Sequence, residues 1–235
     1  MNSVQQNPLE IVVFSLQADE DRRRRLYRLL SDDEKQRAAA FRFDKHRDRF
    51  ITGRGSIREI LADRCNCQPQ AIRFELNAYG KPSFDRPKFA RQVQFNASSS
   101  DAMGAIAICD GMPLGFDMEK TIADARRDYD LIAENEFRED ERDWYRRHRE
   151  GDRISAFFQL WTCKEAYLKA LGLGLGAGLD SFSVDLSGQM PRIRDTDLEQ
   201  DGRSQFHLSQ MDIKPEFVAC LASPKVCGPV AMSHW

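Results

Sequence analysis

Two acidic residues lie two positions apart in the segment LGFDMEK, residues 114–120, whose other residues are typical of a buried strand. Side chains at alternate positions of a β-strand point to the same face, so Asp117 and Glu119 project together, with Phe116 and Met118 opposite. Adjacent carboxylates repel each other unless water or a cation lies between them. The pair therefore predicts either a solvated edge strand or part of a site for a divalent cation.

A second group of charged residues lies in the segment FFQLWTCKEAYLKALG, residues 157–172, whose apolar spacing predicts a largely buried helix. Glu165 and Lys169 are four positions apart and are therefore neighbours on one face of that helix. They could form an ordinary helical ion pair. Alternatively, Glu165 could supply a third carboxylate for the same cation, and Lys169 could face an anion. Mg²⁺ is commonly held by a few carboxylates together with substrate phosphate.

Basic and hydroxyl-bearing residues elsewhere in the chain could bind phosphate. They are Arg37, Arg54, Lys81 and the run Ser98–Ser100. Each of them is also compatible with a solvated surface position, and serine runs are common in loops. The residues alone leave both interpretations open.

Capping and spacing signals predict the elements that position these residues. SDDE at residues 31–34 has the form of a capping box and predicts a helix through Phe43. Helical spacing covers residues 50–61, and residues 154–171 form the strongest predicted helix, which ends at Gly172. The polar stretch 123–152 is expected to be partly helical.

Strand signals occur in both halves of the chain. Residues 10–17 predict a first strand, and residues 93–120 predict a strand, a polar loop, a strand, a hairpin turn at Asp110–Gly111 and a third strand. Three further strand-like segments follow the glycine-rich stretch: residues 179–186, 204–213 and 216–223. Strands and helices do not alternate strictly, which favours the α+β class, divided near residues 100–110 and without a clear sequence repeat.

The overall composition excludes several classes of protein. The 235 residues include 35 basic and 37 acidic residues, and the net charge of -2 gives no field that attracts nucleic acid. The six cysteines form no CxxC pair, and no histidine lies near one at zinc-site spacing, so structural zinc and a disulfide framework are not expected. No secretory signal or membrane-length apolar run is present. We expect a cytoplasmic protein that does not bind membranes.

Four segments together resemble a known family. YGKPSF, FNASSS, GFDMEK and WTCKEAYLKALGLGL have the order and approximate spacing of the motifs of the 4′-phosphopantetheinyl transferases of the surfactin-synthetase-activating (Sfp-like) type. The resemblance extends from about Ser31 to the segment LDSFSV. The pattern W-x-x-K-E-A-x-x-K-A-x-G with G-x-D-x-E upstream is specific.

The resemblance implies a fold and a reaction. Members of this family form a pseudo-dimer of two similar α+β halves with the active site in the cleft between them. In this chain the halves would be residues 1–105, contributing to coenzyme A binding, and residues 106–235, carrying the metal-binding and catalytic residues. The enzymes transfer the 4′-phosphopantetheine group of coenzyme A to a serine of an acyl or peptidyl carrier protein and release adenosine 3′,5′-bisphosphate. We expect a monomer.

The resemblance also assigns roles to the residues singled out above. Asp117, Glu119 and Glu165 would hold Mg²⁺, or Mn²⁺, on the pyrophosphate of coenzyme A. Lys169 would stabilise or protonate the leaving phosphate, and Glu165 could serve as general base as well as metal ligand. The nucleotide-binding residues would be Arg37, Arg54, Lys81, Ser98 and Ser99. The family motif normally carries histidine at the position of Ser99, which cannot carry a charge, so this substitution predicts weaker coenzyme A binding.

Two other functions are compatible with parts of the sequence. A non-catalytic module could keep the fold and bind a carrier protein or nucleotide, although the full set of three acids and Lys169 favours an enzyme. A metal-dependent phosphodiesterase would need a water-activating base or a second metal site, and the sequence has no Asp/His cluster to supply one. The carrier could serve fatty-acid, polyketide or nonribosomal peptide synthesis.

Overall fold

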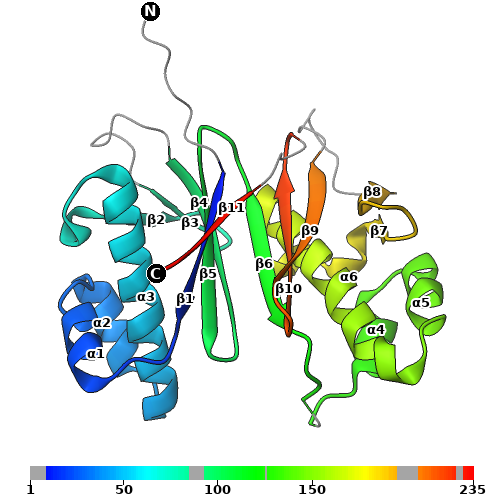
Figure 1. Cartoon of the computed structure of the whole chain (residues 1–235), viewed down its shortest axis with the longest axis horizontal. Helices are drawn as coiled ribbons and strands as arrows, with labels where there is room; N and C mark the ends of the chain where they lie inside the picture. Colours follow the sequence, from blue (N-terminus) through cyan, green and yellow to red (C-terminus); the bar gives the residue numbers. More distant parts are fainter. Residues whose placement is uncertain (1–8, 85–92, 125, 195–205, 226–229) are drawn as a thin grey trace, which may run out of the picture. The chain divides into compact units, whose positions relative to one another are not determined.

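The chain divides into two folding units, and each contains one helix of 22 residues. These helices are α3 (Asp44–Cys65) in unit 1 and α6 (Glu150–Leu171) in unit 2 (Figure 1). The structure is a computed structural model that describes residues 9–84, 93–124, 126–194, 206–225 and 230–235. Unit 1 comprises Met1–Leu76, Pro82–Gly111 and Val230–Trp235, and unit 2 comprises Asn77–Lys81 and Met112–Pro229.

The main sheet of unit 1 has the strand order β11-β1-β5-β4. Its strands are β1 (Glu10–Ser15), β4 (Val93–Ser100), β5 (Met103–Asp110) and β11 (Ala231–His234). The pairs β1–β5 and β4–β5 are antiparallel, whereas β11 adds parallel to β1. One face of this sheet packs on α3 through Val12, Phe14 and Ile106, together with Ile60 and Leu61 of the helix.

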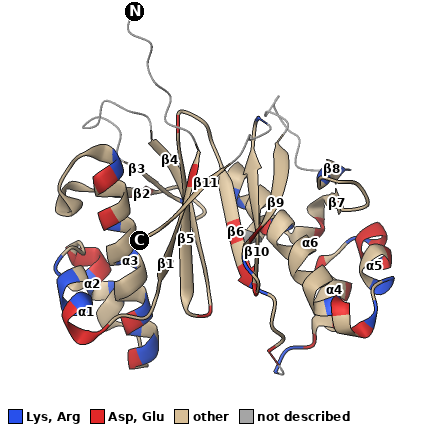
Figure 2. Ribbon diagram, in the orientation of Figure 1, with Lys and Arg blue, Asp and Glu red and all other residues tan. Residues whose placement is uncertain are grey.

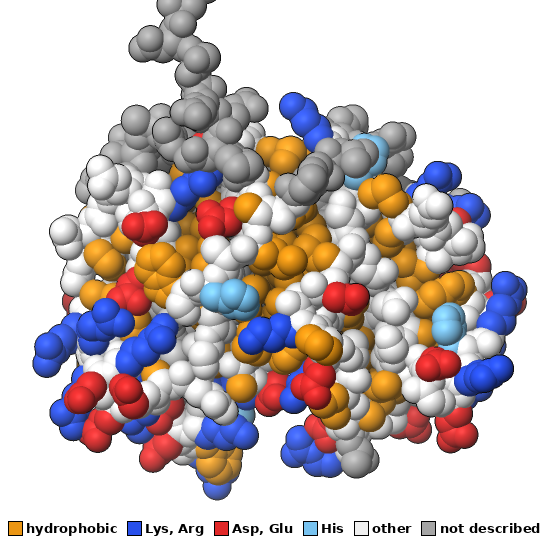
Figure 3. Space-filling model, in the orientation of Figure 1, with side chains coloured by type: hydrophobic (Ala, Val, Ile, Leu, Met, Phe, Trp, Pro, Cys, Tyr) orange, Lys and Arg blue, Asp and Glu red, His pale blue; other side chains and the backbone are white. Residues whose placement is uncertain are grey.

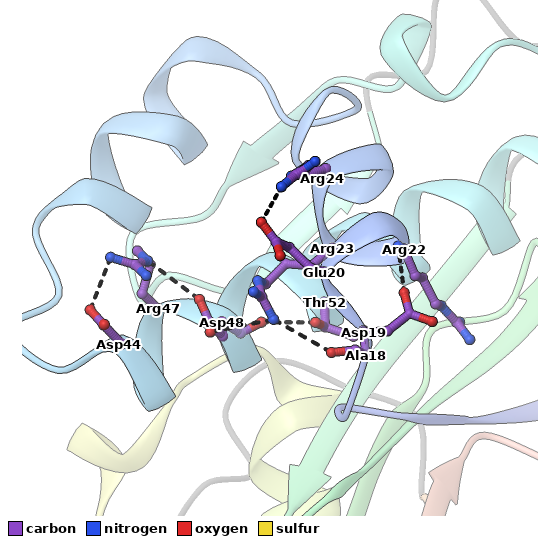
Figure 4. Close-up of polar contacts among 10 residues, drawn as sticks. All are labelled: Ala18, Asp19, Glu20, Arg22, Arg23, Arg24, Asp44, Arg47, Asp48 and Thr52. Atoms are coloured by element: carbon purple, nitrogen blue, oxygen red, sulfur yellow. Dashed lines mark hydrogen bonds and ion pairs between the residues drawn. The ribbon is translucent and has the colours of Figure 1, made fainter.

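Two short helices and a hairpin complete unit 1. They are α1 (Glu20–Tyr27), α2 (Asp32–Ala39), the 3₁₀ turn η1 (Pro69–Ala71), and strands β2 (Phe74–Leu76) and β3 (Pro82–Phe84). Helix α1 approaches α3 closely at Gly55, where an added Cβ would lie 2.6 Å from the Cβ of Leu26. Polar contacts accompany this packing, including the Arg23–Asp48 ion pair at 3.5 Å (Figure 4).

Unit 2 has a smaller sheet with the order β6-β10-β9. Its strands are β6 (Gly115–Lys120), β9 (His207–Lys214) and β10 (Phe217–Ser223), all antiparallel to their neighbours. The other elements are helices α4 (Tyr129–Glu136), α5 (Glu139–Arg146) and α6, the turns η3 (Leu175–Ala177) and η4 (Leu179–Ser181), and the hairpin β7 (Ser183–Asp185) and β8 (Arg192–Arg194).

Helix α6 lies directly against β6 because β6 begins with a glycine. A Cβ at Gly115 would collide with the carbonyl oxygen of Ala166 and the amide nitrogen of Ala170. On the neighbouring strand, Val218, Cys220 and Ala222 belong to the same apolar core as the buried face of the helix. The absent side chain therefore brings the backbones of β6 and α6 into contact.

The α+β class is confirmed, and so are the capping box at Ser31 and the helix that ends at Gly172. The predicted order of strand, loop and strand is confirmed, but the interpretation of the serine run as a loop is wrong, because Ser98–Ser100 form the end of β4 and pair with β5, and only Asp101 and Ala102 join the two strands. Buried Val93 and Phe95 alternate with more polar neighbours in this strand. The alternation of buried and more polar residues, which is typical of a strand, therefore predicts this segment better than the frequency of serine in loops.

The predicted Asp110–Gly111 hairpin is also wrong. Strand β5 pairs with β1 and β4, whereas β6 pairs with β10, so this turn connects the two units. The expected division between residues 105 and 106 falls inside β5, which is continuous because it pairs on both edges. The observed division follows Gly111, and the C-terminal strand returns to unit 1.

Charged side chains of both signs are interspersed over the face that Figure 3 shows, in keeping with the net charge of -2. Among the described helices, none combines the length and apolar character that a membrane crossing requires.

Candidate active site

Strand β6 carries acidic residues, coloured red in Figure 2, and lies against α6. Asp117 is buried and Glu119 is half-buried, while Phe116 and Met118 are fully buried. Asp117 contacts Lys169 of α6, which fixes the direction of its side chain. The predicted alternation along this strand is therefore confirmed for Asp117, and Glu119 shares its face by the same period of two.

Lys169 joins the strand to the helix. Its Nζ donates a hydrogen bond to Oδ1 of Asp117 at 2.6 Å, although Lys169 lies 52 positions further along the chain. Burial lowers the pKa of Lys169, but the facing carboxylates, above all Asp117, outweigh burial and raise it. The ammonium group therefore stays charged beside the acidic residues.

Glu165 lies one helical turn before Lys169, and only 8% of its surface is exposed. Burial raises the pKa of Glu165 to about 7. Lys169 opposes this shift, while the negative charges of Asp117 and Glu119 act in the same direction as burial. The three acidic residues and the lysine thus form one electrostatic cluster in unit 2, built from β6 and α6.

The cluster offers suitable donors for a hard divalent cation, since all three acids supply oxygen atoms. The mutual repulsion that raises the pKa of Glu165 is the kind that a bound cation removes. In the part of the chain that the structure describes, no three Asp, Glu, His or Cys side chains are already gathered as a complete set of metal ligands. Asp117 instead contacts the ammonium group of Lys169.

A buried ion pair that we did not predict holds α6 in place. Nζ of Lys164 donates to both carboxylate oxygens of Glu141, at 2.6 and 2.8 Å, and to the carbonyl oxygen of Phe182 at 2.7 Å. Neither charged side chain is exposed. Glu141 also accepts the backbone N–H groups of Arg138 and Val184. Lys164 is adjacent to Glu165, so this network anchors the helix next to the cluster.

The sequence around Glu141 carries only half of a capping box. Glu141 is the third residue of α5 and accepts the backbone N–H of Arg138, but Arg138 replaces the Ser or Thr that would complete the pattern. Nothing in the local pattern shows that Lys164, 23 positions later, is its partner.

Arg37 and Arg54 both lie in unit 1. Burial lowers the pKa of Arg54, and the positive charge of the nearby Arg37 acts in the same direction. The guanidinium of Arg54 lies over the ring of Phe74, 4.9 Å from its centroid, and 3.4 Å from a carboxylate oxygen of Glu34. The guanidinium of Arg37 lies 5.3 Å from the ring centroid of Phe50. The two arginines therefore provide a local concentration of positive charge beside aromatic rings.

Ser98 and Ser99 lie next to each other on β4, opposite Ala105 and Gly104 of β5. Consecutive strand residues point to opposite faces, and Ser99 is exposed whereas Ser98 is half-buried. The two hydroxyl groups therefore do not point to the same side of the sheet.

Lys81, which we expected in the first half of the chain, is counted with unit 2. Its Nζ donates to the carbonyl oxygens of Leu114, at 3.1 Å, and Ala170, at 3.4 Å. Burial lowers the pKa of Lys81 to about 8. This lysine thus contacts the backbone just before β6 and at the end of α6.

Two family models match the chain. The model of the 4′-phosphopantetheinyl transferase superfamily matches residues 113–222, and the model of the 4′-phosphopantetheinyl transferase N-terminal domain matches residues 17–110. The first match lies within unit 2 and contains the acidic cluster, and the second lies almost wholly in unit 1.

Curated relatives carry the same family name. The 4′-phosphopantetheinyl transferase HetI of a Nostoc species is 34% identical over 69% of this chain and 67% of its own length. The transferase gsp of Aneurinibacillus migulanus is 36% identical over 58% of this chain and 54% of its own length. Sfp of Bacillus subtilis is 27% identical, over 88% and 89% respectively. The chain is therefore an enzyme of the 4′-phosphopantetheinyl transferase superfamily, of the Sfp-like type.

Proposed function

We propose that this enzyme transfers the 4′-phosphopantetheine group from coenzyme A to a serine of an acyl or peptidyl carrier protein. The reaction depends on Mg²⁺ and releases adenosine 3′,5′-bisphosphate. The observation that carries the proposal is the cluster of Asp117, Glu165 and Lys169, held together across β6 and α6 by the 2.6 Å contact of Lys169 with Asp117.

Asp117, Glu119 and Glu165 would hold the cation. A bound Mg²⁺ would supply Lewis-acid neutralisation of charge on the pyrophosphate of coenzyme A. Two of these ligands come from a strand and one from a helix, so the distance between β6 and α6 controls the size of the site. Gly115 sets that distance by removing a side chain from the contact.

In the reaction the serine oxygen forms a bond to the β-phosphorus of coenzyme A, and the bond from that phosphorus to the bridging oxygen breaks. The serine proton passes to Glu165, directly or through water. Glu165 can accept a proton only in its ionised form, which the neighbouring Lys169 and a bound cation both favour. Lys169 stabilises the phosphate that leaves with the nucleotide or gives it a proton, because its ammonium group already lies among the acids.

The nucleotide part of coenzyme A is bound by Arg37, Arg54, Ser98 and Ser99, whereas the ammonium group of Lys81 already donates to two backbone carbonyl groups. The positive charge shared by the two arginines is suited to phosphate, and the nearby rings of Phe50 and Phe74 offer apolar surface.

Intact-mass measurement tests the function directly. The enzyme is incubated with coenzyme A, Mg²⁺ and a panel of unmodified acyl and peptidyl carriers, and one carrier should gain the mass of phosphopantetheine. Adenosine 3′,5′-bisphosphate should form only when that carrier is present. Its formation without carrier would favour a phosphodiesterase, and binding of carrier without a change in mass would favour a non-catalytic module.

Chelation tests the role of the cation. Excess chelator should abolish transfer, and added Mg²⁺ or Mn²⁺ should restore it. Full activity in excess chelator would contradict the assignment of the three acids as metal ligands.

A further inference from the structure

We propose that the loop Asn77–Lys81 is a clamp that positions the catalytic end of α6 against β6, and that Lys81 acts on turnover through this clamp. The inference rests on the proposed transferase function, because it concerns the placement of Lys169 and Glu165 in that reaction. It assigns to Lys81 a role other than direct contact with phosphate, and it adds Asn77 to the functional residues.

The loop is organised around the side chain of Asn77. Oδ1 of Asn77 accepts the backbone N–H groups of Tyr79, at 2.9 Å, and Lys81, at 2.8 Å. The backbone N–H of Asn77 donates to the carbonyl of Lys81 at 3.0 Å, and Gly80 has a positive φ of 82°. The loop is thus a closed turn held by hydrogen bonds within it.

Both ends of this turn donate to backbone carbonyl groups elsewhere in unit 2. Nδ2 of Asn77 donates to the carbonyl oxygen of Gly172 at 2.7 Å. Nζ of Lys81 donates to the carbonyl oxygens of Leu114 and Ala170. Gly172 is the left-handed residue that ends α6, and Ala170 lies in its last turn. Carbonyl groups at this end of a helix lack partners within the helix, and a positive charge is favourable there.

These contacts lie next to the residues that carry the chemistry. Ala170 follows Lys169 directly, and Leu114 precedes Gly115, where the backbones of β6 and α6 touch. By bonding to a carbonyl on each side of this contact, the ammonium group of Lys81 holds strand and helix together close to the Asp117–Lys169 pair. A displacement of about 1 Å between catalytic groups can cost about 10²-fold in rate.

Two variants test the clamp. Lys81→Met keeps the aliphatic chain but cannot donate, and Asn77→Ser shortens the side chain so that it no longer reaches Gly172. In each, kcat should fall by about 10-fold to 10²-fold, while KM for coenzyme A changes by less than about twofold. The loss should be the same with dephospho-coenzyme A as donor. Lys81→Arg, which keeps a charged donor, should recover most of the turnover.

The controls use matching substitutions elsewhere. Lys45→Met and Asn135→Ser change exposed residues on α3 and α4 and should leave kcat unchanged. If Lys81→Met instead raises KM for coenzyme A and not for dephospho-coenzyme A, with kcat unchanged, Lys81 is a phosphate ligand and the clamp is wrong. Normal turnover in both clamp variants would overturn it as well.

Hydrogen exchange provides a readout that does not depend on transfer. The amide of Gly172 donates to the carbonyl of Leu168 at 2.9 Å, so residues 168–173 report on the last turn of α6. Exchange there should accelerate in Lys81→Met and Asn77→Ser but not in the two controls. If the wild-type enzyme modifies no carrier, the proposed function fails, while this measurement still decides whether the loop holds the helix. Unaltered exchange in both clamp variants would show that it does not.

Discussion

Apart from strand β11, the described parts of unit 1 and unit 2 contain the same order of helices and strands. Each begins with a strand, continues with two short helices and one helix of 22 residues, and ends with a two-stranded hairpin and a further pair of strands. The sheet orders also correspond, since β1-β5-β4 matches β6-β10-β9. The sequence itself gave no clear sign of this repeat.

Both units also use the same kind of buried ion pair. In unit 1, Nε of Arg58 donates to Glu34 at 2.7 Å, and the guanidinium also donates to two backbone carbonyls. In unit 2, Lys164 and Glu141 form the equivalent pair. Each glutamate is the third residue of its helix and accepts the backbone N–H of the residue before that helix, and each cation lies at the same distance from the end of its long helix.

The units differ at two positions of their first strands. Val12 and Phe14 are the third and fifth residues of β1, where β6 has Asp117 and Glu119. Phe14 fills the space over Gly104, which has no side chain. In unit 1 these positions complete an apolar core, whereas in unit 2 they form the acidic cluster. The same arrangement of strand and long helix therefore forms an apolar core when apolar side chains face the helix, and a charged cluster when acidic side chains face it.

The largest expected effect is a loss of stability when either buried ion pair is broken. It tests whether Arg58–Glu34 and Lys164–Glu141 stabilise their units equally. Arg58→Met and Lys164→Met should each lower the free energy of unfolding by about 3–5 kcal/mol, because each removes the nearest cationic partner of a buried glutamate. Urea unfolding measures this. Arg54→Met is the control, since its pair with Glu34 is longer and its side chain is 19% exposed, and it should cost less than about 1 kcal/mol. If only one of the two variants loses much unfolding free energy, the two ion pairs share a geometry but not a stabilising role.

The second prediction tests the chemical difference between the first strands. Asp117→Asn should lower kcat by about 10²–10³-fold, the scale for losing one preorganised charge. Val12→Thr, at the equivalent position of β1, should alter stability but leave the turnover of folded enzyme unchanged. Steady-state kinetics with both variants checks this. Near-normal turnover of Asp117→Asn would remove Asp117 from the set of ligands.

The third prediction concerns the contribution of unit 1 to nucleotide binding. Ser99→His should strengthen binding of coenzyme A by up to about 1.5–3 kcal/mol, because a charged donor replaces a hydroxyl. The gain should be larger below the ordinary imidazole pKa of about 6.5 and absent for dephospho-coenzyme A. KM for both donors at two pH values measures it. A strong wild-type preference for coenzyme A that Ser99→His leaves unaltered would show that another group binds the 3′-phosphate.

The smallest effect concerns Lys81. Burial lowers its pKa to about 8 from an ordinary value near 10.5. Between these values the unfolded chain holds more protons than the folded one, so this group makes the folded state more stable as pH rises. Relative to Lys81→Met, the wild-type enzyme should therefore gain stability from pH 8 to pH 10, by less than about 1 kcal/mol because the lysine is half-buried. Urea unfolding at both pH values detects this, and a relative loss would contradict the burial of the ammonium group.

Several features followed from the sequence because they depend on neighbouring residues. The capping box at Ser31, the helix that ends at Gly172 and the shared face of Asp117 and Glu119 are consequences of local hydrogen bonding and of fixed helix and strand periods. The four family motifs likewise identified the superfamily. Local signals failed where one turn sequence fits two structures. Asp110–Gly111 has the sequence of a hairpin turn, but the sequence of a turn does not specify whether the strands on its two sides pair with each other.

Only the tertiary structure decided which distant residues meet. Lys169 contacts Asp117 across 52 positions, Lys164 contacts Glu141 across 23, and Asn77 contacts Gly172 across 95. None of these pairings is encoded by spacing, because each depends on how a helix lies against a strand or a loop. The sequence by itself determined which side chains this protein has for chemistry. The packing of α6 on β6 decided which of them share a charge environment, because burial and proximity, not residue type, set the pKa of Glu165 and the partner of Lys169.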